Sequence, residues 1–258
     1  TSGQCLNWFA TQTDKMVFNI DYPAIVTDGL VLNLDAGFTP SYPTTGTTWY
    51  DVSPSGNNVT LINGPTYSSN DGGGIVFDGI DDYGITTVNQ TPDLNITSSI
   101  TIESWIKSTA LANASHGAGI NSKGLSSDNN TGVYETLLIK SGVSNYPFFR
   151  LRIGGISPAY IPLNIPISLN QTYHFVSTYD GSTMRIYING VESGTGLSTS
   201  GSIETNTQQL TVGTRYLQRS GSNSAFSGSV FENMIYNRAL TAAEILQNYN
   251  AQKSRFGL

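Results

Sequence analysis

The 258-residue sequence has few charged residues: Asp, Glu, Lys and Arg together make up 12% of it, about half of the ~25% usual in soluble globular domains. The formal net charge is −6, because 18 acidic residues face only 12 Lys and Arg. These basic residues form no cluster that could neutralise several phosphates at once. We therefore expect neither nucleic acid nor an anionic membrane as a partner.

Cysteine and long apolar runs are also scarce. The single cysteine, Cys5, cannot form an internal disulfide, so the fold does not depend on oxidation. No apolar run approaches the ~18 residues of a membrane-spanning helix, and we expect no membrane insertion. The start TSGQCLNWF lacks the charged-then-apolar order of a signal peptide. Because the chain begins with Thr1 instead of Met, we expect it to be processed or truncated.

Glycine and small polar residues are abundant where charged residues are few. They separate short runs rich in β-branched and aromatic residues. This pattern predicts an all-β fold, an antiparallel two-sheet jelly-roll-like sandwich. Residues 1–28 lack a sustained period and are predicted to be an N-terminal arm or connector, with residues 29–258 forming the domain. The clearest predicted strands are Leu30–Leu34, Ile75–Phe77, Tyr83–Thr86, Ile100–Lys107, Tyr134–Ile139, Phe148–Ile153, Tyr173–Tyr179, Met184–Ile188, Leu210–Val212 and Val230–Tyr236.

Two local patterns are specific. Asp180-Gly181-Ser182-Thr183 separates two of the predicted strands and indicates a hairpin, and Asn189-Gly190 supplies the positive-φ pair of a second tight turn. Thr241 and Glu244 have the spacing of a capping box, and Leu240 and Ile245 that of a hydrophobic staple. These residues predict one short C-terminal helix over about Ala242–Gln252, lying on the sandwich.

Four segments resemble a known family. They are FDGIDDY (77–83), TIESWIK (101–107), YHFVSTYDGSTMRIYING (173–190) and FSGSVFENMIYNRALTAAEI (226–245), and they occur in the order typical of laminin-G-like domains. Those domains belong to the concanavalin A-like lectin/glucanase superfamily, so the resemblance implies a laminin-G-like sandwich over residues 29–258.

The two ends of this region carry a narrower resemblance. GLVLNLDAGFTPSYPTTGTTWYDVS (29–53) and NYNAQKSRFGL (248–258) are similar to the versions of this domain in structural proteins of tailed bacteriophages. The resemblance implies a virion component, such as a fibre, tail or capsid-decoration protein, that contacts other virion subunits as a homo-oligomer. A lectin-like domain of this kind would attach to a cell-surface glycan.

Four acidic residues are candidates for a calcium site. Asp78, Asp81 and Asp82 lie in a tight turn between two predicted strands, and closely spaced hard oxygen ligands are what Ca²⁺ requires. Glu232 places a carboxylate in an otherwise apolar strand row. Some members of the resembled superfamily bind a structural Ca²⁺ at the rim of the sandwich. The alternative is that the aspartates cap a β-turn and Glu232 accepts hydrogen bonds.

No catalytic constellation is recognisable, and we expect no enzyme. Glycoside hydrolysis needs two carboxylates about 5–10 Å apart, yet Glu103 has no acid two residues away on its strand face. A glycoside hydrolase would require Glu103 to meet another acid across strands. His116 and His174 have no metal-ligand spacing, and His174 is expected to hydrogen-bond within its strand.

Several residues in or beside the predicted loops could contact a sugar, because pyranose rings present apolar faces and hydroxyl rims. These candidates are Trp49, Tyr50, His116, Tyr134, Tyr146, Tyr160 and Tyr216. The sequence leaves three hypotheses: a non-enzymatic lectin-like virion protein, a purely structural assembly protein that binds no sugar, and a glycoside hydrolase.

Overall fold

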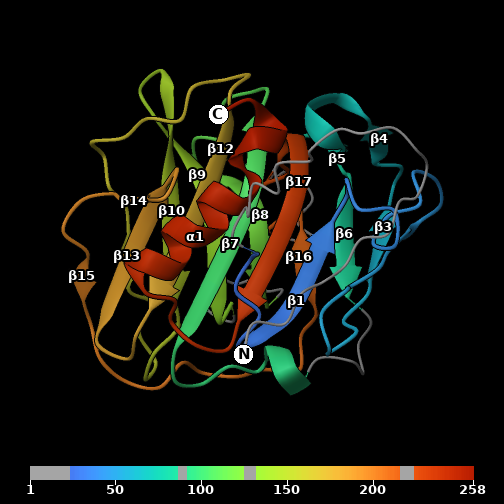
Figure 1. Cartoon of the computed structure of the whole chain (residues 1–258). Coiled ribbons are helices and arrows are strands. Elements are labelled where there is room, and N and C mark those ends of the chain that lie inside the picture. Colours follow the sequence, from blue (N-terminus) through green and yellow to red (C-terminus); the bar gives the residue numbers. More distant parts are fainter. Residues whose placement is uncertain (1–23, 87–91, 125–131, 216–223) are drawn as a thin grey trace, which may run out of the picture.

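The computed structural model describes residues 24–86, 92–124, 132–215 and 224–258. These residues form two antiparallel sheets, of nine and eight strands, that share one apolar core. One α-helix lies across the outside of the nine-stranded sheet (Figure 1). The predicted all-β sandwich with one C-terminal helix is confirmed.

We call the nine-stranded sheet sheet A and the eight-stranded sheet sheet B. The path of sheet A is β14 (Val191–Glu192), β13 (Thr183–Ile188), β12 (Thr172–Tyr179), β7 (Ile100–Ser108), β17 (Ser227–Tyr236), β5 (Gly74–Asp78) and β4 (Thr66–Ser68), with β1 (Leu30–Asp35) beside β17 and β15 (Leu197–Ser198) beside β13. The path of sheet B is β11 (Ala159–Tyr160), β10 (Ser144–Leu151), β9 (Tyr134–Ser141), β8 (Ala118–Lys123), β16 (Leu210–Val212), β6 (Tyr83–Thr86), β3 (Val59–Ile62) and β2 (Thr48–Trp49). Three 3₁₀ turns are η1 (Asn70–Gly72), η2 (Pro92–Leu94) and η3 (Lys253–Phe256).

The inner faces of the two sheets form the main core. Ile102 and Ile186 come from sheet A and Phe149 from sheet B, and each of these side chains is at most 1% exposed. Burying one such side chain contributes roughly 1.5–3 kcal/mol. Alternate residues of each strand therefore point away from this core, and these outward positions decide what each outer face can do.

Helix α1 (Ala242–Gln252) covers the outer face of sheet A. Both halves of the predicted capping box are present: the Thr241 side chain accepts from the Glu244 N–H, and the Glu244 carboxylate accepts from the Thr241 N–H. Leu240 and Ile245 are both buried in the small cluster beneath the helix, as the staple predicts. The ring of Trp105 on β7 stacks on Phe256 just after the helix, with 4.2 Å between ring centroids.

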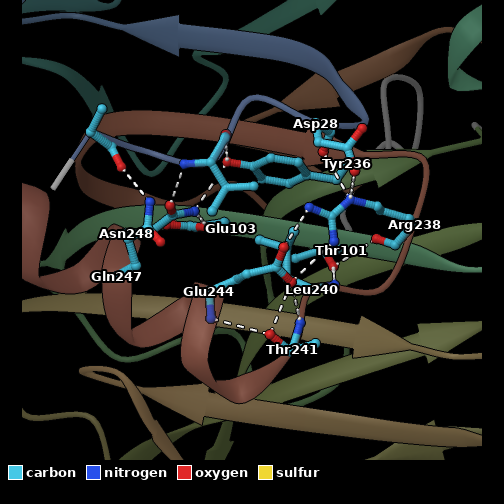
Figure 2. Close-up of polar contacts among 12 residues, drawn as sticks. Asp28, Thr101, Glu103, Tyr236, Arg238, Leu240, Thr241, Glu244, Gln247 and Asn248 are labelled. Atoms are coloured by element: carbon cyan, nitrogen blue, oxygen red, sulfur yellow. Dashed lines mark hydrogen bonds and ion pairs between the residues drawn. The ribbon is translucent and has the colours of Figure 1, made fainter. Parts of the chain in front are cut away.

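A buried hydrogen-bond network ties this helix to the sheet and to the segment before β1 (Figure 2). Asn248 of α1 donates to the Glu103 carboxylate at 2.8 Å and to the Tyr236 hydroxyl at 3.1 Å, and it accepts from the Val26 N–H at 2.8 Å. The Tyr236 hydroxyl donates in turn to the Val26 carbonyl. His174 does not bond within its strand as expected, because its Nε2 lies 2.7 Å from the Glu103 carboxylate on the neighbouring strand.

Residues 24–28 pack on the domain, whereas residues 1–23 of the predicted arm lie outside the described residues. Ile25 and Val26 contact the cluster beneath the helix. Among the described residues, no helix has the length and apolar character needed to cross a membrane.

Candidate functional site

The three aspartates of the predicted calcium turn do come together. Asp78 ends β5 in sheet A and Tyr83 begins β6 in sheet B, so the turn crosses from one sheet to the other at an end of the sandwich. One ligand oxygen from each of Asp78, Asp81 and Asp82 lies within 4.8 Å of the others. A hollow of about 270 Å³ lies beside Asp78, lined also by Leu111 and Asn113.

The same aspartates also shape the turn. Asp78 Oδ1 accepts from the Ile80 N–H at 2.7 Å, and the Asp82 carboxylate accepts from the Asp78 N–H at 3.0 Å. Burial raises the pKa of Asp82, and the neighbouring charges of Asp78 and Asp81 raise it further, against a backbone hydrogen bond that lowers it. A bound cation would relieve this repulsion, so the cluster has both a turn-capping role and an electrostatic preference for a cation.

Glu232 does not belong to this group, which corrects the four-residue calcium prediction. Its side chain lies on the outer face of sheet A, where Glu232 pairs in register with Trp105 on β7 and with Asp35 on β1. It is 2% exposed. Burial raises the pKa of Glu232 well above its ordinary range, and the nearby charges of Asp35 and Glu103 add to this effect. Met234 and Tyr236 share its face, but a β-bulge between Val230 and Glu232 turns Val230 into the main core, and the face of Glu232 is the helix-covered one and not the rim.

Two of the predicted sugar contacts are wrong because their side chains are in the core. Trp49 and Tyr134 are each 0% exposed and belong to the cluster between the sheets. The Tyr134 hydroxyl donates to the Leu94 carbonyl, and burial raises its pKa strongly. Neither ring can serve as a platform for an external ligand.

The other aromatic candidates lie in different places. The ring of Tyr160 packs against the core, and its hydroxyl donates to the Ser193 carbonyl and accepts from the Gly196 N–H. Tyr50 is 44% exposed but follows β2, at the opposite edge of sheet B from β10 and β11. Tyr216 lies outside the described residues.

Tyr146 lies on the outer face of sheet B, where it begins a row of side chains along β10. Along β10, Tyr146, Phe148 and Arg150 alternate with fully buried residues and are each half-buried. Since alternate residues of a strand lie about 6.8 Å apart on one face, these two rings and the guanidinium form a line beside the edge strand β11. The neighbouring residue of Phe148 on β9 is Leu137, which is buried but lies outside the core cluster.

A polar row crosses the sheet at the Arg150 end of this line. Arg150, Glu135, Ser122 and Thr211 are directly opposite one another on β10, β9, β8 and β16. The Glu135 carboxylate, 1% exposed, lies 2.8 Å from Arg150 Nη2 and 3.0 Å from Arg215 Nε. Two guanidinium groups therefore share this one buried carboxylate.

Gly119 explains how Arg215 reaches this row. Gly119 pairs with Leu137, so a side chain at position 119 would lie on the same outer face as Leu137. A Cβ there would come within 2.4 Å of the Arg215 backbone nitrogen. Only glycine allows the segment after β16 to approach the sheet this closely. Arg215 Nη1 also donates to the His116 carbonyl, which places the predicted contact His116 beside this group.

The outer face of sheet B therefore combines two half-exposed aromatic rings with a charged, hydrogen-bonding row. Tyr146 and His116 were predicted as contacts, whereas Phe148, Arg150, Glu135 and Arg215 were missed. An alternation signal was present in the string NYPFFRL (145–151), although the sequence does not say which of its two faces is the outer one. Such a face can hold an apolar ring and hydrogen-bond polar groups around it.

Comparison with known families gives one match. Residues 78–246, more than half of the chain, match the family model described as concanavalin A-like lectin/glucanases superfamily. No curated protein matches the sequence.

Solved structures share the fold at low sequence identity. The binding domain of Paraclostridial Mosquitocidal Protein 1 is 19% identical with a TM-score of 0.63, over 86% of this chain and 52% of that one. The binding domain of botulinum neurotoxin serotype G is 16% identical with a TM-score of 0.63, over 87% and 51%. Domain 4 of AbnA, a GH43 extracellular arabinanase from Geobacillus stearothermophilus in complex with arabinotriose, is 16% identical with a TM-score of 0.58, over 87% and 100%. The chain thus spans about half of each toxin domain and the whole of the arabinanase domain.

Proposed function

The chain belongs to the concanavalin A-like lectin/glucanases superfamily, and we propose that it is a non-enzymatic domain that binds a glycan through the outer face of sheet B. The observation that carries this proposal is the line of Tyr146, Phe148 and Arg150 on β10, beside the buried Glu135. Aromatic rings offer the apolar faces of a sugar a platform, and the partly exposed guanidinium of Arg150 offers hydrogen bonds to its hydroxyls. A domain of this fold in the arabinanase AbnA is in complex with arabinotriose.

The burial of the carboxylates on sheet A supports binding over hydrolysis. Glu103 does face another acid across strands, because Glu232 on the adjacent β17 contributes to the same electrostatic environment. However, both lie on the face covered by α1 and are 0% and 2% exposed. A sugar cannot reach them without removal of the helix. Glu135 on the opposite face is held between two arginines instead of a second carboxylate.

The finer role that we propose is that of a virion protein: a fibre, tail or capsid-decoration component that attaches to a cell-surface glycan and contacts other subunits. Its support is the similarity of residues 29–53 and 248–258 to structural proteins of tailed bacteriophages. Immunolabelling of purified particles tests this location, and absence of the chain from the particles contradicts it. Sedimentation of the full chain and of a variant lacking residues 1–23 tests whether the arm mediates association, because residues 24–28 pack on the domain itself.

We also propose that the three-aspartate turn holds a structural Ca²⁺. The convergence of Asp78, Asp81 and Asp82 within 4.8 Å and the raised pKa of Asp82 support it. These residues would supply carboxylate oxygens, the ligands that Ca²⁺ prefers. The cation would fix the connection between the two sheets near the β7–β8 loop, which also contacts Arg215 through His116.

A binding experiment with matched aromatic variants tests the glycan proposal. The wild type, Tyr146→Ala, Phe148→Ala and the control Tyr50→Ala are titrated against a panel of bacterial polysaccharides and oligosaccharides by calorimetry. Tyr50 is also exposed but lies at the opposite edge of sheet B. We expect each β10 variant to lose about ten-fold or more in affinity, since ~1.4 kcal/mol is ten-fold, with the control unchanged. Circular dichroism confirms the fold of each variant.

Two results would contradict the proposal. If no saccharide binds the wild type at millimolar concentration, with or without calcium, the domain is not a lectin, and the purely structural role is favoured. If Tyr50→Ala alone loses affinity, the ligand binds at the other edge of the sheet.

A further inference from the structure

The charged row on the outer face of sheet B contains more positive than negative charge. Two guanidinium groups, those of Arg150 and Arg215, share the single carboxylate of Glu135. Among the described side chains of this group there are thus two positive charges and one negative charge. The chain as a whole has a formal charge of −6. Two guanidinium groups close together on an acidic protein favour a negatively charged ligand at this face.

Arg150 is the arginine that can act on an external group. Its Nη2 lies 2.8 Å from Glu135, and its guanidinium forms no other hydrogen bond with the residues that the structure describes. An arginine has five N–H donors in a planar fork, so most of this fork is not used by the described residues. The side chain is 14% exposed, and it stands on the same face of β10 as the half-exposed ring of Phe148.

The next arginine along the chain has a different partner. Arg152 follows Arg150 two residues along the chain, and its Nε lies 2.7 Å from the Glu204 carboxylate. Arg152 thus has a carboxylate of its own, whereas Arg150 shares one with Arg215. Arg150, at the end of the line of aromatic rings, is therefore the guanidinium that we consider for an external ligand.

From this geometry, and on the premise of the proposed glycan-binding function, we propose that the ligand is an acidic glycan, with the carboxylate of a uronic or sialic acid paired to Arg150. The planar fork of arginine matches the two oxygens of a carboxylate. An adjacent sugar ring rests on Phe148, about 6.8 Å from Arg150 along the strand, and Tyr146 extends the platform by the same step. A neutral glycan would offer the Arg150 guanidinium no negative charge.

The experiment compares acidic and neutral versions of the same glycan. The probes are galacturonic acid oligomers against their methyl-esterified forms, and sialyllactose against lactose. The proteins are the wild type, Arg150→Gln, Arg150→Lys and the control Arg185→Gln, which removes a half-buried arginine of sheet A. We expect the wild type to bind at least one acidic probe ten-fold or more tightly than its neutral form. This preference should weaken as salt is raised.

The variants separate the role of Arg150 from a general charge effect. Arg150→Gln should abolish the preference while binding of the neutral probe persists, Arg150→Lys should retain part of it, and the control should change nothing. We expect each Arg150 variant to keep the fold, because Glu135 stays paired with Arg215. Thermal unfolding of each variant measures this.

Failure of this inference differs from failure of the proposed function. Equal affinity for acidic and neutral probes in the wild type overturns the acidic-glycan inference and leaves glycan binding intact. A preference that survives in Arg150→Gln overturns the assignment to Arg150. Absence of binding to every probe overturns both.

Discussion

Replacing Asn248 with alanine should cost more stability than any other single polar substitution on helix α1. The Asn248 amide is 0% exposed and joins three elements: β7 through Glu103, β17 through Tyr236, and the segment before β1 through Val26. The bond to the Glu103 carboxylate is charge-assisted and contributes about 1.5–3 kcal/mol, and the two others contribute about 1 kcal/mol each. The Glu103 carboxylate, 0% exposed, also loses one of its partners.

We therefore expect Asn248→Ala to lower the free energy of unfolding by about 3–5 kcal/mol and the melting temperature by roughly 6–20 °C. Urea and thermal unfolding followed by circular dichroism measure both. The control is Asn250→Ala on the same helix, because the Asn250 side chain forms no hydrogen bond with the described residues. Alanine is the better helix former by up to ~0.7 kcal/mol, so the control should be neutral or slightly stabilising. A loss below about 1 kcal/mol for Asn248→Ala would refute the view that this network fixes the helix.

Three further predictions concern the sheet A face and the aspartate turn. Because burial and nearby acids raise the pKa of Glu232, its carboxyl stabilises the fold when protonated, and this stabilisation is lost as pH rises through the folded pKa. Glu232→Gln should thus raise the urea midpoint at about pH 8–9 and change this midpoint little at about pH 4. A lower midpoint at alkaline pH would contradict this. Thr241→Ala removes the helix cap and should cost about 0.5–2 kcal/mol, with recovery in Thr241→Ser. Calcium at 100 times its Kd should stabilise the wild type by about 2.7 kcal/mol, as measured by thermal unfolding. Asp81→Asn should abolish this stabilisation, whereas the exposed control Asp93→Asn should keep it. Equal calcium responses of the two variants would exclude the turn as the site.

The parts of the fold that the sequence predicted depend on residues close together in the chain. The Asp180–Thr183 turn needs only its own backbone: the Asp180 carboxylate accepts from the N–H groups of Ser182 and Thr183. Burial opposes ionisation of Asp180, but these hydrogen bonds and Arg185 lower its pKa to about 2. The capping box and staple likewise involve positions three to five residues apart. Such patterns identify a hairpin and a helix before any tertiary contact is known.

The parts that the sequence missed depend on strand register. Tyr134 and Glu135 are neighbours, and a shift of one residue exchanges the face on which each lies. The structure turns Tyr134 into the core and Glu135 outward to Arg150 and to Arg215, which is 80 residues away. The apolar row around Glu232 was visible in the sequence, yet only the tertiary structure shows that the helix-covered face and the nearby Asp35 and Glu103 surround its carboxylate. Alternation gives the spacing of side chains, whereas long-range pairing decides which face receives a ligand.

Glu135 provides a test in which stability and acidic-glycan affinity change in opposite directions. Its carboxylate is shared by two guanidinium groups whose side chains are only 14% and 10% exposed. Glu135→Gln should therefore destabilise the fold by about 3 kcal/mol. The same change removes a negative charge beside Arg150, and at ~5 Å and an effective dielectric constant of ~20 that repulsion is about 3 kcal/mol. Affinity for an acidic probe should consequently rise by ten-fold or more, while affinity for the neutral probe stays constant. The control Glu204→Gln removes a more exposed carboxylate, which pairs with Arg152, and should change the acidic affinity less. If Glu135→Gln remains folded and loses affinity for both probes alike, the carboxylate is itself a sugar ligand and not the neutralising partner inferred for Arg150.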